Sequence, residues 1–149
     1  MNLFKAMKIS ASGLSAERLR MDVISSNIAN ANSTRSAEGG AYRRQVALLS
    51  SVKEQAVHFK SMFKNALGKK EEMGGVRVVS IIEDPSPLKS VYDPSHPDAN
   101  AEGYVEYPNV DMMKEMVEMI TASRAYEANV TVLNSTKSMA LKTLEIGKG

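Results

Sequence analysis

The chain has 149 residues, a length that fits one domain or one small domain with extensions. Hydrophobic residues make up 43% and charged residues 24%, as in chains that fold, and the net charge of +2 is too small to indicate nucleic acid as a partner. The sequence contains no cysteine, which excludes disulfides, thiolate catalysis and cysteine-bound metals.

The first predicted element is a helix over residues 3–29. Its apolar residues recur at intervals of seven, at Met7, Leu14, Met21 and Ile28. Gly13 lies inside this pattern, although glycine costs about 1 kcal/mol relative to alanine within a helix. Either a close contact with a second helix or a local kink would explain this glycine.

Three asparagines, Asn27, Asn30 and Asn32, mark the end of this helix. Asparagine is a mediocre helix former, but its side chain both donates and accepts hydrogen bonds and tolerates turn conformations. Our hypothesis is that Asn27 and Asn30 bond backbone groups of the adjoining loop or of the C-terminal helix, while Asn32 serves the turn. The alternative is that all three are plain turn and cap residues.

The middle of the chain predicts a small β module. Residues 76–82 are β-branched and apolar, and they are bounded by Gly-Gly on one side and Asp-Pro on the other, which is typical of a strand. Further strands are expected over 42–52, 89–92 and 103–107. Between the first two strands, residues 53–72 form either a short amphipathic helix or an ordered loop.

A second long helix is predicted after residue 108, where Asn109 or Asp111 caps its start, and it ends at Gly147. At about 1.5 Å per residue it would be roughly 50 Å long, more than a small domain covers. Its seam repeats every 3.5 residues, as in a coiled coil. The seam residues are Met112, Met116, Met119, Ser123, Tyr126, Val130, Leu133, Lys137, Ala140 and Leu144.

The predicted fold is therefore mainly α with a small β module, in which long N- and C-terminal helices pair in a coiled-coil-like manner around a β-rich middle. The expected segments are 1–35, 36–108 and 109–149. Because Ser123 and Lys137 weaken the seam as a self-sufficient zipper, we expect contacts with neighbouring chains as well as within the chain. The candidate interface residues are Met7, Leu14, Met21, Ile28, Met112, Met116, Met119, Tyr126, Val130, Leu133 and Leu144.

No pattern in the sequence indicates catalysis, a cofactor, a bound metal or a small-molecule substrate. Its two histidines, His58 and His96, have no partner at ligand spacing. The loop carboxylates do not match a calcium-binding loop. Arginines that are expected to lie on solvated helix and strand edges, rather than in a patch for nucleic acid, are Arg18, Arg20, Arg35, Arg43 and Arg44.

Two stretches near the ends of the chain carry a family resemblance. The first comprises Ser12-Gly13-Leu14, Arg18 and Ser26-Asn27-Ile28-Ala29-Asn30-Ala31-Asn32. The second comprises Pro108-Asn109-Val110-Asp111, Glu115-Met116, Ala122-Ser123-Arg124-Ala125-Tyr126-Glu127-Ala128-Asn129, Lys137-Ser138-Met139 and Leu144. Together they resemble the N- and C-terminal signatures of the bacterial flagellar rod and hook proteins.

The middle of the chain is similar to the short proximal-rod subunits of that family. The similarity is carried by Gly74-Gly75-Val76, Val79, Ile82, Val91-Tyr92-Asp93-Pro94, Pro97, Asp98-Ala99-Asn100 and Gly103-Tyr104-Val105. The stretch 51–73 departs from the pattern, because it is longer than in compact members of the family. The structural motif residues are Gly13, Asn27, Asn30, Asn32, Asn109, Asp111 and Arg124.

The resemblance implies a structural protein without enzymatic activity. Such a subunit assembles helically with copies of itself and with other rod proteins into the shaft that crosses the periplasm and transmits torque for motility. A basal-body adapter at the membrane ring is a further implied partner. It is exported unfolded by the flagellar type III apparatus without signal cleavage, and the N-terminal residues contain no long apolar run typical of a cleaved signal. The alternative is a free-standing coiled-coil adaptor or secretion-associated interaction protein, which would form a stable soluble dimer.

Overall fold

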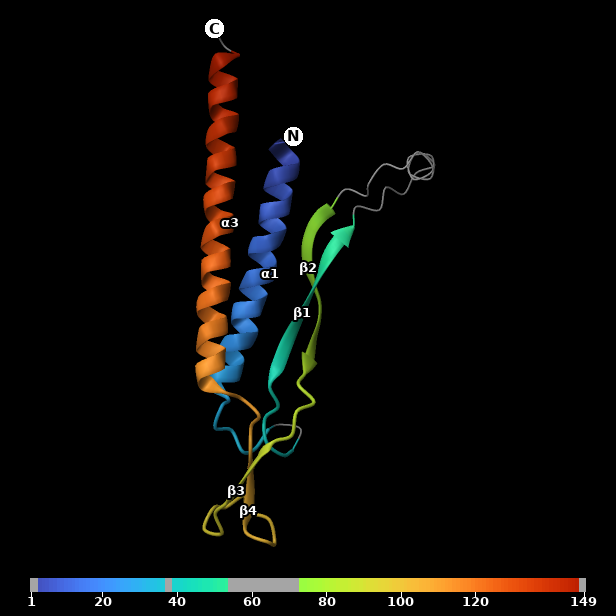
Figure 1. Cartoon of the computed structure of the whole chain (residues 1–149), viewed down its shortest axis with the longest axis vertical. Helices are drawn as coiled ribbons and strands as arrows, with labels where there is room; N and C mark the ends of the chain where they lie inside the picture. Colours follow the sequence, from blue (N-terminus) through green and yellow to red (C-terminus); the bar gives the residue numbers. More distant parts are fainter. Residues whose placement is uncertain (1–2, 37–38, 54–72, 148–149) are drawn as a thin grey trace, which may run out of the picture.

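The computed structural model describes residues 3–36, 39–53 and 73–147. Two long helices lie side by side, and a β-hairpin runs next to the first of them. A second hairpin extends from the end of the pair at which α1 ends and α3 begins (Figure 1). The elements are α1 (Leu3–Ala29), β1 (Gln45–Lys53), β2 (Met73–Glu83), β3 (Lys89–Tyr92), β4 (Tyr104–Tyr107) and α3 (Met112–Ile146). The predicted class, mainly α with a small β module, is confirmed.

The two helices are antiparallel, and two contacts between them show the same register. Gly13 of α1 lies against Asn129 of α3, and Asn27 bonds Glu115, so fourteen residues separate the two contacts on either helix. A Cβ atom at Gly13 would lie 3.0 Å from the side-chain nitrogen of Asn129. Since α1 continues through Gly13 as one helix, the glycine serves a close helix–helix approach rather than a kink.

Most of the buried residues of the two helices are small or polar. On α1 the buried residues are Ser10, Gly13, Ala16, Val23, Ile24 and Asn27, and on α3 they are Glu115, Ala122 and Thr136. Many of the large apolar side chains of α3, from Met113 to Ile146, are exposed instead. The two helices therefore approach each other closely, while many large apolar side chains of α3 do not pack against α1.

The hairpin of β1 and β2 is antiparallel, pairing Gln45 with Glu83, and it packs on α1. At the far end of the hairpin, the amide of Val76 donates to the hydroxyl oxygen of Ser12 at 3.1 Å. Gly75, the residue before Val76, has a φ of +104°. A Cβ atom on Gly75 would collide with the Ser12 side chain. Glycine is thus required both by the backbone conformation and by the close approach to α1.

The second hairpin pairs β3 with β4, from Lys89 opposite Tyr107 to Tyr92 opposite Tyr104. The rings of Tyr92 and Tyr104 meet edge to face with centroids 5.3 Å apart, and Val105 is fully buried. All four predicted strands are confirmed, although the first begins at Gln45 rather than at residue 42. The alternative helix or loop expected at 53–72 lies outside the described residues beyond Lys53, which ends β1.

Of the two candidate caps of α3, the structure selects Asp111. Its carboxylate accepts hydrogen bonds from the amides of Met113 at 3.0 Å and Lys114 at 3.3 Å. At the other end, the amide of Gly147 donates to the carbonyl of Thr143. No helix in the described ranges is both long and apolar enough to cross a membrane.

Candidate functional site

A cluster of polar side chains joins α1, β1, the end of β2 and α3 at the base of the helix pair. We call it the polar junction. Its residues are Asn27, Tyr42, Arg44, Gln45, Asp84, Asn109, Glu115 and Glu118. Residues far apart in the chain meet here, because α1 ends where β1 and α3 begin (Figure 1).

Asn27 is the centre of the polar junction and is fully buried. Its amide nitrogen donates to the carbonyl of Gln45 at 2.8 Å and to Glu115 Oε2 at 2.9 Å. Its oxygen accepts from the amide of Gln45 at 2.9 Å and from the hydroxyl of Tyr42 at 3.0 Å. These four bonds use the whole capacity of the side chain, so one residue ties α1 to β1 and to α3.

Arg44 supplies the positive charge of the polar junction and is only 8% exposed. Its Nε donates to Glu115 Oε1 at 2.6 Å, and its Nη2 lies 3.1 Å from both carboxylate oxygens of Glu118. Nη1 lies 3.5 Å from Asp84. Burial alone would lower the pKa of Arg44, but the hydrogen bond to Glu115 and the three surrounding carboxylates raise this pKa above its ordinary value.

Asn109 joins the segment before α3 to the residues that flank β1 and β2. Its oxygen accepts from the amide of Arg44 at 2.8 Å, and its nitrogen donates to the carbonyls of Asp84 at 3.2 Å and Ser86 at 3.1 Å. Asn109 therefore does not cap α3. It fixes the position of the segment that leads into α3.

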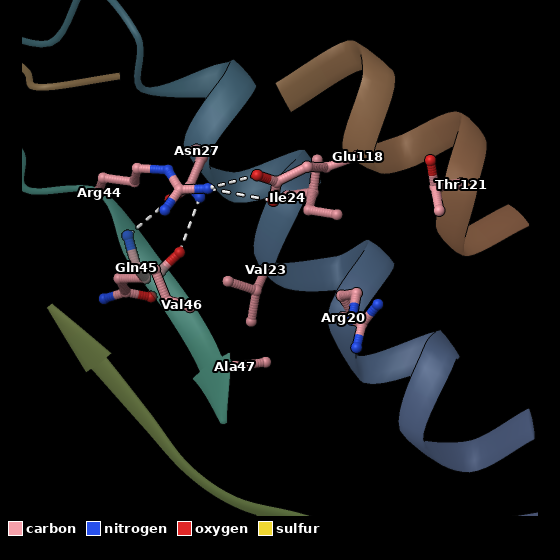
Figure 2. Close-up of a pocket in the computed structure, with 10 residues that line it drawn as sticks. All are labelled: Arg20, Val23, Ile24, Asn27, Arg44, Gln45, Val46, Ala47, Glu118 and Thr121. Carbon is pink, nitrogen blue, oxygen red and sulfur yellow. Dashed lines mark hydrogen bonds and ion pairs between the residues drawn. The ribbon is translucent and has the colours of Figure 1, made fainter. Parts of the chain in front are cut away.

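A cleft of about 270 Å³ lies beside the polar junction and is lined by residues of α1, β1 and α3. Its apolar lining includes Val23 and Ile24, and Arg20 and Thr121 lie along the helices further from the junction (Figure 2). The dashed lines in Figure 2 show Arg44 reaching Glu118, and the lining groups Asn27 and Gln45 bond each other. Among residues 3–36, 39–53 and 73–147, no cluster of His, Asp or Glu could hold a metal ion. The hydrogen bonds and ion pairs of the polar junction hold α1, β1 and α3 in position relative to one another.

The outward face of α3, opposite α1, forms a second notable surface. Met113, Val117 and Ile120 recur there at steps of four and three, and Met113 and Val117 are 70% and 61% exposed. Further along the same face the residues are polar, as at Thr131 and Ser135, which are also exposed. The apolar part of this face is thus confined to the first turns of α3, next to the polar junction.

The candidate interface residues fall into two groups in the structure. Half-buried positions are Met7, Leu14, Met21, Ile28, Met119, Tyr126, Val130 and Leu133, and exposed positions are Met112, Met116 and Leu144. The buried positions of α3, Glu115, Ala122 and Thr136, precede the predicted Met116, Ser123 and Lys137 by one residue each. The interface role of these residues stays a prediction.

The motif residues also differ in their surroundings. Gly13, Asn27, Asn109 and Asp111 have the contacts described above. Asn30 donates to the carbonyl of Ser26 at 2.9 Å and accepts from the Ser33 hydroxyl, so its predicted bond to loop or α3 backbone is wrong and it caps its own helix. Asn32 lies exposed in the turn after α1, and Arg124 is exposed on α3.

Sequence reasoning missed the role of Arg44, which was expected on a solvated edge and is buried among carboxylates instead. The available signal was Glu115, an acid on the helix face that packs against α1. Because a buried carboxylate needs a cation or several donors, this position predicts a basic partner somewhere in the chain. The sequence does not reveal which arginine that partner is.

Comparison with known proteins identifies the family. Residues 7–37 match the family model described as flagella basal body rod protein, and residues 101–146 match that of the flagellar basal body rod FlgEFG protein C-terminal. The Bacillus subtilis flagellar basal-body rod protein FlgC is 48% identical over 99% of this chain and its own full length. The FlgC proteins of Borreliella burgdorferi and Yersinia enterocolitica are 48% and 44% identical over at least 99% of this chain and their full lengths. The chain therefore belongs to the FlgC family of flagellar basal-body rod proteins.

Proposed function

We propose that this structural subunit of the basal-body rod joins its neighbours through the large apolar side chains that face away from its own helix pair. The observation that carries the proposal is the exposure of Met113, Val117 and Ile120 directly opposite the contact with α1. A contiguous exposed apolar patch marks an interaction site in most soluble proteins. Membership of the rod family favours this role over that of a free-standing coiled-coil adaptor.

The assembly is proposed to be helical, in the proximal rod, and to contain copies of this chain and other rod proteins. The apolar patch at the base of α3 has no equivalent on the polar middle of the same face, so a contact made there joins two different surfaces. Contacts of this heterologous kind generate an open helical array when their rotation does not close a ring. Such an array would form a shaft that crosses the periplasm, transmits torque and meets an adapter at the membrane ring.

Export by the flagellar type III apparatus, unfolded and without signal cleavage, completes the proposal. It is supported by the architecture of the chain, in which few large apolar residues are fully buried within the described ranges. A chain with a small private core unfolds at modest cost and gains its remaining burial on assembly. We expect no catalytic activity, because the role needs only surfaces that pack.

The test compares two variants on one helix face. Val117→Asp places a charge in the proposed contact, and Ser135→Asp places the same charge eighteen residues further, which is five full turns at 3.6 residues per turn. We expect Val117→Asp to reduce the amount of subunit in purified basal bodies at least tenfold and to abolish swimming, because an unpaired carboxylate in an apolar contact costs several kcal/mol. Ser135→Asp should swim like the parent. Normal assembly of Val117→Asp would rule out this face as the contact.

A further inference from the structure

The loop that joins β3 to β4 carries His96, which is the only histidine in the part of the chain that the structure describes. Its ring nitrogen Nδ1 accepts a hydrogen bond from the backbone amide of Asp98 at 3.1 Å. Pro97 lies between the two and has no amide hydrogen, so the amide of Asp98 is the first one after His96 that the ring can bind. A ring that accepts at Nδ1 is neutral and carries its proton on Nε2.

Asp98 joins this loop to the segment that follows α1. Its carboxylate accepts a hydrogen bond from the Thr34 hydroxyl at 2.9 Å and lies 3.9 Å from the Arg35 guanidinium. Thr34 and Asp98 are 64 residues apart in the sequence, so this bond holds together two parts of the fold. We call the hydrogen bonds and the ion pair among His96, Asp98, Thr34 and Arg35 the loop contact.

Two acidic residues and an aromatic ring surround His96. Asp98 follows it on the same loop, and Asp93 accepts the backbone amide of His96 with its carbonyl at 3.3 Å. From β4, the ring of Tyr107 meets the imidazole edge to face, with centroids 6.4 Å apart. Lys89 lies opposite Tyr107 on β3, but its amino group is hydrogen bonded to a backbone carbonyl of the segment before α3. A positive charge on His96 would therefore arise close to two carboxylates.

Protonation of His96 acts on the loop contact in two ways. Histidine changes its charge between about pH 5 and pH 8. The charged ring carries a hydrogen on Nδ1, so it no longer accepts from the amide of Asp98. Its charge also competes with Thr34 and Arg35 for the carboxylate of Asp98. Because both effects weaken the contact in the protonated form, the contact is complete at higher pH and is lost as the pH falls through the titration of the ring.

We propose that His96 is a pH-sensitive switch for the loop contact: the neutral ring keeps the loop of the second hairpin joined to the segment after α1, and the protonated ring releases it. The second hairpin is then held less firmly against the base of the helix pair in acid than at neutral pH. This inference goes beyond the proposed rod role and does not depend on it, since the isolated full-length chain suffices to test it.

Nuclear magnetic resonance of the isotopically labelled chain between about pH 8 and about pH 5 tests the switch. At the higher pH the ring of His96 should carry its proton on Nε2, and the amide signals of Thr34 and Arg35 should move with the titration of the ring. Protection of the Asp98 amide from hydrogen exchange, corrected for its intrinsic rate, should fall at least about twofold on protonation, because one hydrogen bond is lost. A neutral ring with its proton on Nδ1, or Thr34 and Arg35 signals that do not follow the titration, would overturn the proposal.

Two variants of His96 separate the lost acceptor from other effects of pH. His96→Asn keeps an acceptor near the position of Nδ1 but does not titrate, so its Thr34 and Arg35 signals should stay near those of the parent at the higher pH. His96→Phe keeps a ring against Tyr107 but has no acceptor, and it should resemble the acidic form of the parent throughout. The matched control, His58→Asn, should titrate like the parent. A full pH response in His96→Asn, its loss in His58→Asn, or a His96→Phe variant that matches the neutral parent contradicts the proposal.

Discussion

The residue that defines the polar junction, Asn27, has a side chain whose donors and acceptors are all used. Aspartate has nearly the same shape but lacks the two donors, and alanine lacks all four groups. Because the Asn27 side chain is fully buried, neither replacement gains water as a substitute partner. The same reasoning explains why an asparagine occupies a helix position where its intrinsic propensity is poor.

Arg44 offers the sharpest test of the polar junction. Arg44→Met leaves the buried carboxylate of Glu115 without its cation, and we expect it to lower the free energy of unfolding by about 3–5 kcal/mol. Adding Glu115→Gln to this variant removes the unpaired charge and should restore part of the loss. Urea unfolding followed by circular dichroism measures both.

The neighbouring arginine provides the control for this prediction. Arg43 is exposed, so Arg43→Met should change the free energy of unfolding by less than about 0.5 kcal/mol. If Arg43→Met and Arg44→Met lower the free energy of unfolding equally, the effect of Arg44→Met comes from the change in net charge and not from its buried ion pairs.

Asp84 makes the stability of the polar junction depend on pH. Hydrogen bonds from the hydroxyl and the amide of Ser86, and then the charge of Arg44, hold the pKa of Asp84 below its usual range. A group whose pKa is lower in the folded chain stabilises it above the unfolded pKa of about 3.9, and this stabilisation is lost as the pH falls through the folded value. We expect the difference in unfolding midpoint between the parent and Asp84→Asn to shrink as the pH is lowered from 5 towards 2. A difference that stays constant over this range would contradict the assignment.

At the scale of elements, Gly13 sets how closely α1 and α3 approach. A valine there would add two methyl groups beyond a Cβ that already lies 3.0 Å from the Asn129 side chain. We expect Gly13→Val to destabilise the chain by about 1–3 kcal/mol through overpacking. Ala11→Val is the control, because it introduces the same valine at an exposed position two residues earlier on α1. If both variants unfold at the same urea concentration, the helices are not in close contact at Gly13.

The elements were predictable because their signals are local. Apolar repeats and helix ends predict α1 and α3, and the β-branched run before Asp84 predicts β2. Which side of each helix packs inwards was harder to infer, since Glu115 and Thr136 occupy inward positions that a search for apolar residues passes over. Arg44 was misjudged for a related reason. Its partners come from the residue after β2 and from α3, and no local pattern records contacts across 71 residues.

At the scale of the whole molecule, burial is unevenly distributed along the axis. The buried apolar side chains in the described part of the chain are Ala16, Val23, Ile24, Ala41, Val105, Pro108, Val110 and Ala122. Most of them lie near the polar junction or in the second hairpin, and the upper part of the helix pair relies on small residues such as Gly13. The base is therefore the best-packed part of the described chain, and α3 extends from it with many of its large apolar side chains exposed.

This distribution predicts a gradient of local stability in the isolated chain. Amides of residues 20–29 and 112–122, which adjoin the polar junction, should exchange with deuterium more slowly than those of residues 3–13 and 130–146, because opening near the base breaks buried ion pairs and opening near the tips does not. Hydrogen exchange with mass spectrometry on dilute monomer measures this. In purified basal bodies the tips should become protected, since assembly covers them. Uniform protection along both helices of the monomer would mean that the pair is stable without neighbours, and the exposed apolar face of α3 would then need another explanation.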